Sequence, residues 1–292
     1  MRTQLKSSVK SLFLLLSQAC RAVGLDKFQA RDGFISRKEF LAGLQASGSV
    51  LEIGPFDQPI MRGAHVRYFD VMDQPALIQR AQACGRNQDG CPHIDYVSDR
   101  GDLSIITEEK FDSVVSSHCI EHQPDFIRHC NQVFDILLPG GRYFVIVPDK
   151  RFVFDYYLPE TRASDVLAAH AEAREVHTTA SIIAHHAETT HNIPIRHWMG
   201  FHRPLRTTSP YVERLQAALR LTSTEAEDYI DVHGWFFTPK SFLGILETLS
   251  QVGAICFDIE RVYGTPFGSN EFFAVLRKRA PGECSAKIST VV

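Results

Sequence analysis

Several patterns that mark other classes of protein are missing from this 292-residue sequence. It has no G-x-G-x-x-G loop, which counts against a nicotinamide-dependent dehydrogenase. None of its seven cysteines lies in a C-x-x-C pair, so we expect reduced thiols and a cytoplasmic protein. The net charge of −3 provides no basic field, so nucleic acid is not expected as a partner. These absences favour an ordinary globular protein.

Long apolar runs are also scarce. The run Leu12 to Leu16 follows Lys6 and Lys10 and superficially resembles a short signal sequence. It is much shorter than the about 20 residues that a transmembrane helix needs. We therefore expect no transmembrane segment, and we interpret residues 1–48 as a helical lead-in. Its amphipathic helix would pack on the domain or lie on a partner, which would allow peripheral association.

From Ser49 onward, strand-like and helix-like segments alternate, which predicts a parallel sheet. Apolar and β-branched runs predict five strands, and helical spacing of apolar residues predicts two helices between them. The strands are expected at residues 49–53, 65–71, 93–98, 111–118 and 142–148, and the helices at 75–86 and 125–138.

The C-terminal part of the chain predicts a different pairing. Thr238 as N-cap and Pro239 at the first position begin a helix that ends at Gly253. Residues 254–264 and 270–278 follow as two strands with no room for a helix, so they must form an antiparallel hairpin. The predicted fold class is therefore α/β, a doubly wound, seven-stranded, mostly parallel sheet with a C-terminal antiparallel hairpin strand.

Residues 150–232 interrupt this alternation. The segment is helical in character and holds seven of the thirteen histidines, from His170 to His202. We interpret residues 49–149 and 233–279 as a Rossmann-like domain, and 280–292 as a tail. An insertion after the fifth strand lies over the strand ends, so we expect residues 150–232 to form a lid over the acceptor site.

A glycine and several polar residues follow the predicted strands at their carboxyl ends, where ligands of open α/β sheets bind. They are Glu52, Gly54, Asp70, Asp73, Asp102 and His118. Each aspartate has a structural alternative, because loop aspartates often cap the following helix. Only eleven residues, 54–64, separate the first two strands, so the first crossover helix is reduced to about a turn.

Taken in order, these features resemble the class I S-adenosylmethionine-dependent methyltransferases. The fourth strand runs into SSHCIEHQPD, the segment LLPGGRYFVIVPD follows, and the chain closes with the hairpin. The resemblance is to the group whose fourth strand ends in Ile–Glu–His, the methyltransferase type 11-like proteins. It covers Ser49 to Asp149 and His233 to Arg277, and it implies S-adenosylmethionine as cofactor.

The resemblance also implies roles for the first two strand ends. Gly54 would let the loop backbone approach the methionine part of the cofactor, and Glu52 would face its ammonium group through water. Asp70 would accept hydrogen bonds from both ribose hydroxyls, a charge-assisted contact. This loop departs from the family pattern of several glycines, since Gly54 is followed by PFDQP.

The next two strand ends complete the implied cofactor site. Asp102 would accept a hydrogen bond from the exocyclic amine of adenine, while Leu103 would pack against the ring face. His118 would line the sulfonium end.

Two histidines are candidates for catalysis of methyl transfer. Positioning supplies most of the barrier reduction in such a displacement, and a hydroxyl acceptor also benefits from a general base. Histidine has a suitable pKa, about 6.5. His122 follows the fourth strand and His233 precedes the last helix, so both can face the methyl group. Either could instead be a polar side chain satisfied within its loop.

The insertion suggests a polar acceptor. Arginines and histidines can bind hydroxyls, carboxylates or phosphates, and aromatic rings can stack on a sugar. We predict O-methylation of a polar small molecule, or of a hydroxyl of a sugar, nucleotide sugar or glycan. N-methylation of an amine or amino sugar is the alternative within enzymes, and a non-catalytic methyltransferase-like binding module is the alternative outside them. No pattern in the sequence sets an oligomeric state.

A metal site is a further alternative for the insertion. Two or three imidazoles and a carboxylate could come from His185, His186, Glu188, His191, His197 and His202. Their spacing matches no H-E-x-x-H or C-x-x-C site. We therefore predict no bound metal.

Overall fold

The computed structural model describes residues 31–45, 48–202, 209–224, 229–280 and 284. The helix expected around Leu12 to Leu16 lies outside this part of the chain. The described chain begins with helix α2 (Arg37–Gln45), which precedes the first strand. No helix of the described residues is long and apolar enough to cross a membrane.

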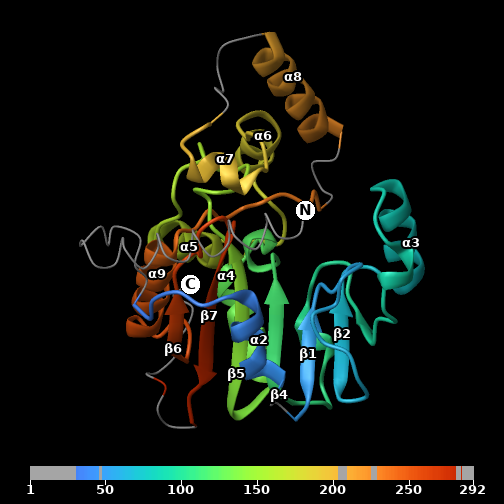
Figure 1. Ribbon diagram of the computed structural model, residues 1–292, viewed down its shortest axis with the longest axis vertical. Helices are drawn as coiled ribbons and strands as arrows, with labels where there is room; N and C mark the ends of the chain where they lie inside the picture. Colours follow the sequence, from blue (N-terminus) through green and yellow to red (C-terminus); the bar gives the residue numbers. More distant parts are fainter. Residues whose placement is uncertain (1–30, 46–47, 203–208, 225–228, 281–283, 285–292) are drawn as a thin grey trace, which may run out of the picture.

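Seven strands form one sheet in the order β3-β2-β1-β4-β5-β7-β6 (Figure 1). Their bounds are β1 (Val50–Ile53), β2 (Val66–Asp70), β3 (Tyr96–Val97), β4 (Phe111–Ser117), β5 (Leu137–Pro148), β6 (Phe257–Tyr263) and β7 (Glu271–Lys278). The first five strands pair in parallel, and β7 is antiparallel to both of its neighbours. The predicted seven-stranded sheet and terminal hairpin are confirmed. Strand β3 is shorter than predicted, with only two residues, whereas β5 begins five residues earlier than predicted.

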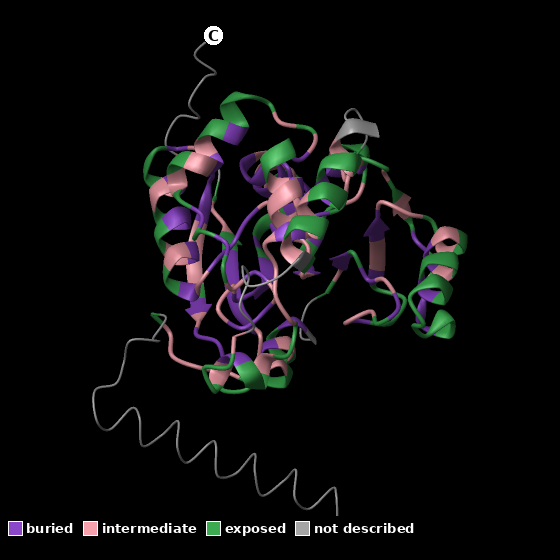
Figure 2. Cartoon of the chain, turned by 90° about the horizontal axis from the view of Figure 1, so that it is seen from above, coloured by how far each residue is buried: buried purple, intermediate pink, exposed green. Residues whose placement is uncertain are grey.

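Alternation of side chains gives the sheet two apolar faces. One face packs under α4 (Phe126–Ile136), α5 (Ala163–Ala171) and α9 (Pro239–Gln251). The opposite face packs against Phe40 and Leu44 of α2. Seen from above, the strands are buried and the outer sides of the helices are exposed (Figure 2). Helices therefore cover both faces of the sheet, which is doubly wound. The carboxyl ends of its strands are not part of these covered faces.

Local sequence explains where the covering helices begin. Asp125 caps α4 by accepting a hydrogen bond from the Arg128 amide, and Thr238 caps α9 through the Ser241 amide. Pro239 occupies the first turn of α9, as predicted. Helix α3 (Gln74–Ala83) is capped by Asp73, which lies just beyond β2.

The connection from β1 to β2 contains no helix, only turns. Asp57 is almost fully buried in this loop and accepts three hydrogen bonds from Arg86, the shortest at 2.8 Å. The guanidinium group lowers the pKa of Asp57. This ion pair fixes a loop that a crossover helix would otherwise support.

The insertion divides between two layers. Helix α5 packs on the core through Val166 and Ala169, so it belongs to the layer that covers the sheet. Helices α6 (Thr179–Ala187), α7 (Pro194–Trp198) and α8 (Ser209–Thr224) lie above the carboxyl ends of the parallel strands (Figure 1). The lid at 150–232 stays a prediction, and α5 lies outside any such lid because its apolar face is buried by α4 and α9.

The expectation of reduced cysteines needs one correction. Cys256 and Cys284 form a disulfide, which joins the segment before β6 to the end of the described chain. The other four described cysteines, Cys84, Cys91, Cys119 and Cys130, are free thiols. The 28-residue separation of the bonded pair matches no motif, so local patterns could not predict this disulfide.

Candidate active site

The loop after β1 leaves open space above its glycine. Gly54 has a φ of +69°, and a Cβ built on it would meet no atom within 4 Å. Its amide donates to the carbonyl of Phe69 at 2.9 Å, which ties the turn to the end of β2. A residue with a side chain would be strained here and would project into this space. The geometry therefore suits the close approach of a ligand.

Glu52 is turned inward and has a different role from the one expected. Its carboxylate accepts hydrogen bonds from the amides of Ile60 (2.7 Å) and Met61 (3.0 Å), so it holds the far end of the loop. Burial raises the pKa of Glu52 to about 7, although these two hydrogen bonds and nearby arginines oppose the shift. With 2% of its surface exposed, Glu52 supports the loop that follows β1 and does not face a ligand directly.

Asp70 lies at the carboxyl end of β2, beside the Gly54 loop. One carboxylate oxygen accepts a hydrogen bond from the Met72 amide at 3.1 Å. Burial raises the pKa of Asp70 to about 6, and the backbone amides of Met72 and Val71 oppose that shift. The helix-capping role belongs to Asp73, so Asp70 is not needed as a cap.

Asp102 and Leu103 are more structural than the resemblance implies. Asp102 caps the short helix η2 (Leu103–Ile105) through the Ser104 amide, and the Gln132 side chain donates to the same oxygen. Burial raises the pKa of Asp102, but these hydrogen bonds outweigh it and leave the pKa lowered. Leu103 is fully buried in the core, so its side chain has no exposed surface to offer an adenine ring.

His118 marks a sharp change of direction after β4. Its φ of +51° is unusual for a residue with a side chain and turns the chain away from the sheet. The ring Nε2 lies 3.0 Å from Oε2 of Glu271, which also pairs with Arg37 at 2.7 Å. Burial lowers the pKa of His118, but Glu271 and Glu121 outweigh it and raise the pKa above its ordinary value.

The Ile–Glu–His segment forms the single turn η3 (Ile120–His122) immediately beyond His118. Ile120 anchors this turn in the core. The carbonyl of Glu121 accepts hydrogen bonds from the amides of Gly234 (2.8 Å) and Trp235 (3.3 Å). These backbone contacts bring His233 over the turn, although it is more than one hundred residues away in sequence.

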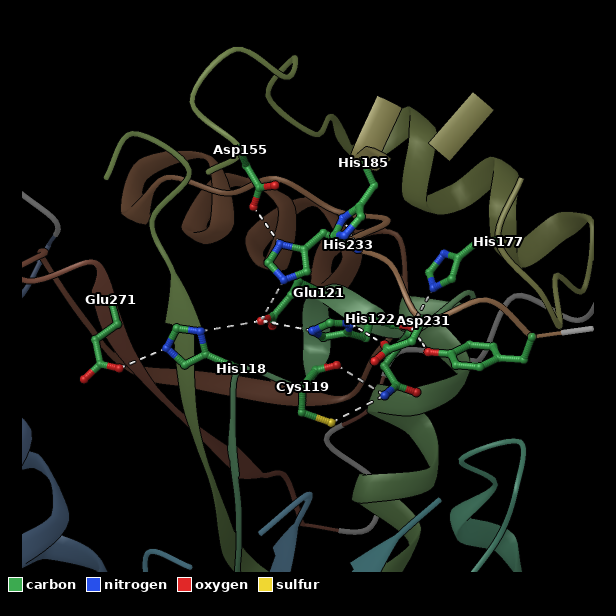
Figure 3. A network of polar contacts seen from close by, with 12 residues as sticks. His118, Cys119, Glu121, His122, Asp155, His177, His185, Asp231, His233 and Glu271 are labelled. Carbon is green, nitrogen blue, oxygen red and sulfur yellow. Dashed lines mark hydrogen bonds and ion pairs between the residues drawn. The ribbon is translucent and has the colours of Figure 1, made fainter. Parts of the chain in front are cut away.

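Glu121 lies at the centre of three imidazoles (Figure 3). Its Oε1 is 3.8 Å from Nδ1 of His118, 3.8 Å from Nε2 of His122 and 3.9 Å from Nε2 of His233. The carboxylate is 0% exposed, and neither oxygen has a hydrogen-bond partner among the described residues. A buried charge so placed needs compensation.

Two aspartates from elsewhere in the chain orient the two histidines proposed for catalysis. Oδ1 of Asp231 lies 2.8 Å from Nδ1 of His122, and Oδ2 of Asp155 lies 2.6 Å from Nδ1 of His233. Burial lowers the pKa of His122, but Asp231 and Glu121 outweigh it and raise the pKa. The pair with His122 strongly lowers the pKa of Asp231. Both rings therefore present Nε2 to Glu121.

Residues of the insertion surround this cluster. Nε2 of His177 lies 3.0 Å from the carbonyl of His122, and the Tyr229 hydroxyl donates to the same carbonyl. The His233 amide donates to Nδ1 of His185 at 3.2 Å. Burial lowers the pKa of both His177 and His185 to about 4, so their rings are neutral near pH 7. His177 and His185 therefore support the cluster around Glu121 through hydrogen bonds to its backbone.

The other histidines of the insertion do not converge on a metal site. Nδ1 of His197 lies 3.0 Å from Nδ1 of His202, and its Nε2 lies 2.9 Å from the His191 carbonyl. Glu188 accepts a hydrogen bond from the Tyr211 hydroxyl instead of facing the rings. Within the described residues, the metal-ligand geometry is found at Glu121, His122 and His233. The metal alternative raised for the insertion is therefore wrong about the residues.

The sequence missed four carboxylates of the site. Glu121 stands within the quoted Ile–Glu–His segment, yet only its histidine was assigned a role. Asp155, Asp231 and Glu271 come from a loop, the end of the insertion and the start of β7, where no motif marks them. Only the folded chain places them beside the histidines.

Fold and site together define a class of protein. An open α/β sheet with this strand order, a glycine loop after β1 and an acid after β2 presents a nucleotide-type ligand site at its carboxyl edge. Residues 52–145 match the model of a family described as a methyltransferase domain. The chain carries a class I methyltransferase domain, and S-adenosylmethionine is the cofactor of this domain.

Several solved methyltransferase structures match this chain at low sequence identity and low TM-score. The mitomycin 7-O-methyltransferase MmcR is 13% identical over 82% of this chain and 50% of that chain, with a TM-score of 0.38. The Burkholderia thailandensis 1,6-didemethyltoxoflavin-N1-methyltransferase is 13% identical over 95% of this chain and 90% of its own, with a TM-score of 0.42. A SAM-dependent methyltransferase from Aquifex aeolicus is 9% identical over 79% and 81%, with a TM-score of 0.38.

These similarities do not identify the methyl acceptor of this chain. The chain spans half the length of the mitomycin enzyme. No curated protein matches the sequence.

Proposed function

We propose that the whole chain is an S-adenosylmethionine-dependent methyltransferase that methylates a hydroxyl of a polar small molecule, sugar, nucleotide sugar or glycan. The observation that carries this proposal is the position of the His122 and His233 rings. They lie at the turn that follows β4, at the same edge of the sheet as the ends of β1 and β2, where Gly54 and Asp70 lie. We also propose that it acts in the cytoplasm; the four free thiols support this, whereas the Cys256–Cys284 disulfide is unusual for that compartment.

The proposed roles follow from these positions. Bound cofactor supplies an electrophilic methyl group on a sulfonium. Gly54 allows its close approach, Asp70 accepts hydrogen bonds from its ribose hydroxyls, and Asp102 remains our candidate for the adenine amine. His118, at the end of β4, lines the boundary between cofactor and acceptor. His122 and His233 hold the acceptor hydroxyl and favour loss of its proton, while helices α6 to α8 exclude water from above.

An amine of a small molecule or amino sugar is the second candidate acceptor. The observation that favours it is the number of carboxylates at the site, because Glu121, Asp155, Asp231 and Glu271 would attract a cation. A protonated amine has no lone pair for attack, so it would first have to lose a proton. A panel of matched sugars and amino sugars, assayed with methyl-labelled cofactor, distinguishes the two candidates by which one acquires label.

Calorimetry with S-adenosylmethionine and S-adenosylhomocysteine tests the cofactor site. Replacing Asp70 by Asn removes a charged acceptor from the ribose, and hydrogen bonds to charged groups contribute about 1.5–3 kcal/mol. We therefore expect Asp70→Asn to weaken both ligands by about 10- to 150-fold.

Asp73→Asn is the matched control, because Asn caps a helix as well as Asp does and the residue lies three positions away. Its affinities should equal those of the wild type. Absence of binding at millimolar cofactor, or equal affinities for the two variants, would contradict the cofactor assignment and favour a non-catalytic binding module.

A further inference from the structure

The Glu121 carboxylate has no compensation from hydrogen bonds among the described residues, although it is fully buried. Leaving a carboxylate unpaired in the interior is strongly unfavourable. The three ring nitrogens around Oε1 lie at 3.8–3.9 Å, beyond the range of a hydrogen bond. Spacings of this size suit donor atoms that share an ion between them.

Each of the three imidazoles is held by a carboxylate on its other nitrogen. Glu271 contacts Nε2 of His118, while Asp231 and Asp155 contact Nδ1 of His122 and His233. Carboxylate–histidine pairs of this kind fix the tautomer and orientation of metal ligands. The nitrogens that remain are the ones that face Glu121 (Figure 3).

The net charge of the site also favours the binding of a divalent cation. Four carboxylates surround the rings, whereas the guanidinium groups that pair with them are two, Arg37 on Glu271 and Arg80 on Asp231. Imidazoles that bind a metal are neutral, so in the metal-bound state the four carboxylates exceed the two guanidinium groups of the described residues by two negative charges. A divalent ion would balance this excess.

We propose that Glu121, His122 and His233 bind one divalent first-row transition-metal ion, of the zinc or manganese class. Their ligand atoms all lie within 4.8 Å of one another. Metal–ligand bonds of about 2.0–2.2 Å would require only a small inward adjustment of the side chains. The two imidazole ligands favour zinc over magnesium or calcium, whereas manganese prefers oxygen ligands such as the Glu121 carboxylate. Nδ1 of His118, 3.8 Å from the same carboxylate oxygen, adjoins the set.

The role of the ion rests on the proposed function. The acceptor hydroxyl binds the ion through its oxygen, and its proton passes to solvent water because coordination lowers its pKa. The oxygen then forms a bond to the methyl carbon while the carbon–sulfur bond breaks. The electron pair of that bond stays on sulfur, which becomes a neutral thioether. His122 and His233 thus act as ligands that position the nucleophile.

Metal binding is tested on the full chain after treatment with a chelator. Titration calorimetry with zinc chloride and, separately, manganese chloride should show one ion per chain for at least one of the two. Glu121→Gln and His233→Ala should abolish that binding. Asp155→Asn, which removes only the partner of a ligand, should weaken it by about 10- to 100-fold.

His170→Ala is the control, since His170 pairs with Asp125 in the α4–α5 layer outside the cluster, and it should bind the ion as tightly as the wild type. Glu121→Gln conserves shape and removes a buried charge, so its melting temperature without metal should equal or exceed that of the wild type. Absence of binding to the wild type, or equal affinity in Glu121→Gln, would overturn the metal site.

Cofactor calorimetry on the same preparations separates this proposal from the proposed function. Metal binding without cofactor binding would contradict the methyltransferase activity but would support the metal site. If cofactor binding and methyl transfer persist after the ion is removed, the proposed role of the ion is wrong and the proposed activity is supported.

Discussion

The body of the sheet and its carboxyl edge are built on different principles. In the body, apolar residues of β1, β4, β5 and β7 pack between α2 on one face and α4, α5 and α9 on the other. At the edge, carboxylates and imidazoles from five separate segments meet with few apolar contacts (Figure 3). Burial of apolar area stabilises the body. Burial of charged groups at the edge costs desolvation free energy, which the stability of the body must offset.

The largest expected effect tests the body. Phe242 of α9 is fully buried, with Phe126, Phe237 and Phe272 around its ring. Phe242→Ala should lower the free energy of unfolding by about 3–5 kcal/mol, because it removes apolar burial and leaves a cavity. Urea denaturation measures this loss.

The lid provides the contrast for that variant. Phe201 follows α7 and its side chain is 62% exposed. Phe201→Ala should change the free energy of unfolding by about 0.5 kcal/mol or less. Comparable losses for the two variants would mean that the lid contributes as much packing as the body.

The second effect concerns a titratable group inside the body. His129 of α4 is buried, and Nε2 of its ring lies 3.1 Å from the Tyr143 hydroxyl. Burial lowers its pKa to about 4, and Arg128 adds to the shift. The unfolded chain takes up a proton below pH 6.5 while the folded chain does not, so stability is lost as pH falls from 6.5 to 4. The shift corresponds to about 3 kcal/mol.

His129→Leu should remove that part of the pH dependence, and thermal melts at pH 4.5, 5.5 and 7.5 measure it. The acid-induced loss in melting temperature should be smaller than in the wild type. The remaining loss should reflect His177 and His185, whose pKa values are also about 4. The same substitution at the exposed His93 serves as control, and an equal change there would contradict the assignment to burial.

The third effect tests the edge. Gly54→Ala places a side chain at a φ of +69°, which should destabilise the fold by about 1–2 kcal/mol. Its Cβ would also enter the space above the loop, so affinity for S-adenosylmethionine should fall as well. Denaturation and calorimetry measure the two effects separately.

Gly140 offers a matched control at the opposite end of the sheet. Its φ is +75° and its Cβ would likewise meet no atom within 4 Å. Gly140→Ala should therefore cost the same stability without changing cofactor affinity. If both variants bound the cofactor like the wild type, Gly54 would be a turn residue only.

The sequence alone determined the order of the strands and helices, the terminal hairpin, and the helix start at Thr238. These features depend on neighbouring residues, because apolar periodicity and capping act over one element at a time. The same local logic located Gly54, Asp70 and the Ile–Glu–His turn at strand ends. It could not distinguish a ligand-facing acid from one that holds the backbone, as Glu52 and Asp102 demonstrate.

Tertiary structure alone decided which groups meet. The chain returns after the insertion to hydrogen-bond the Glu121 carbonyl, and this return places His233 and Asp231 beside His122. It also assigned α5 to the core and bonded Cys256 to Cys284. Such contacts join residues far apart in sequence, and their formation depends on the packing of the whole sheet. Local patterns fix the elements, and only the closed fold brings separate segments close enough for their charges to interact.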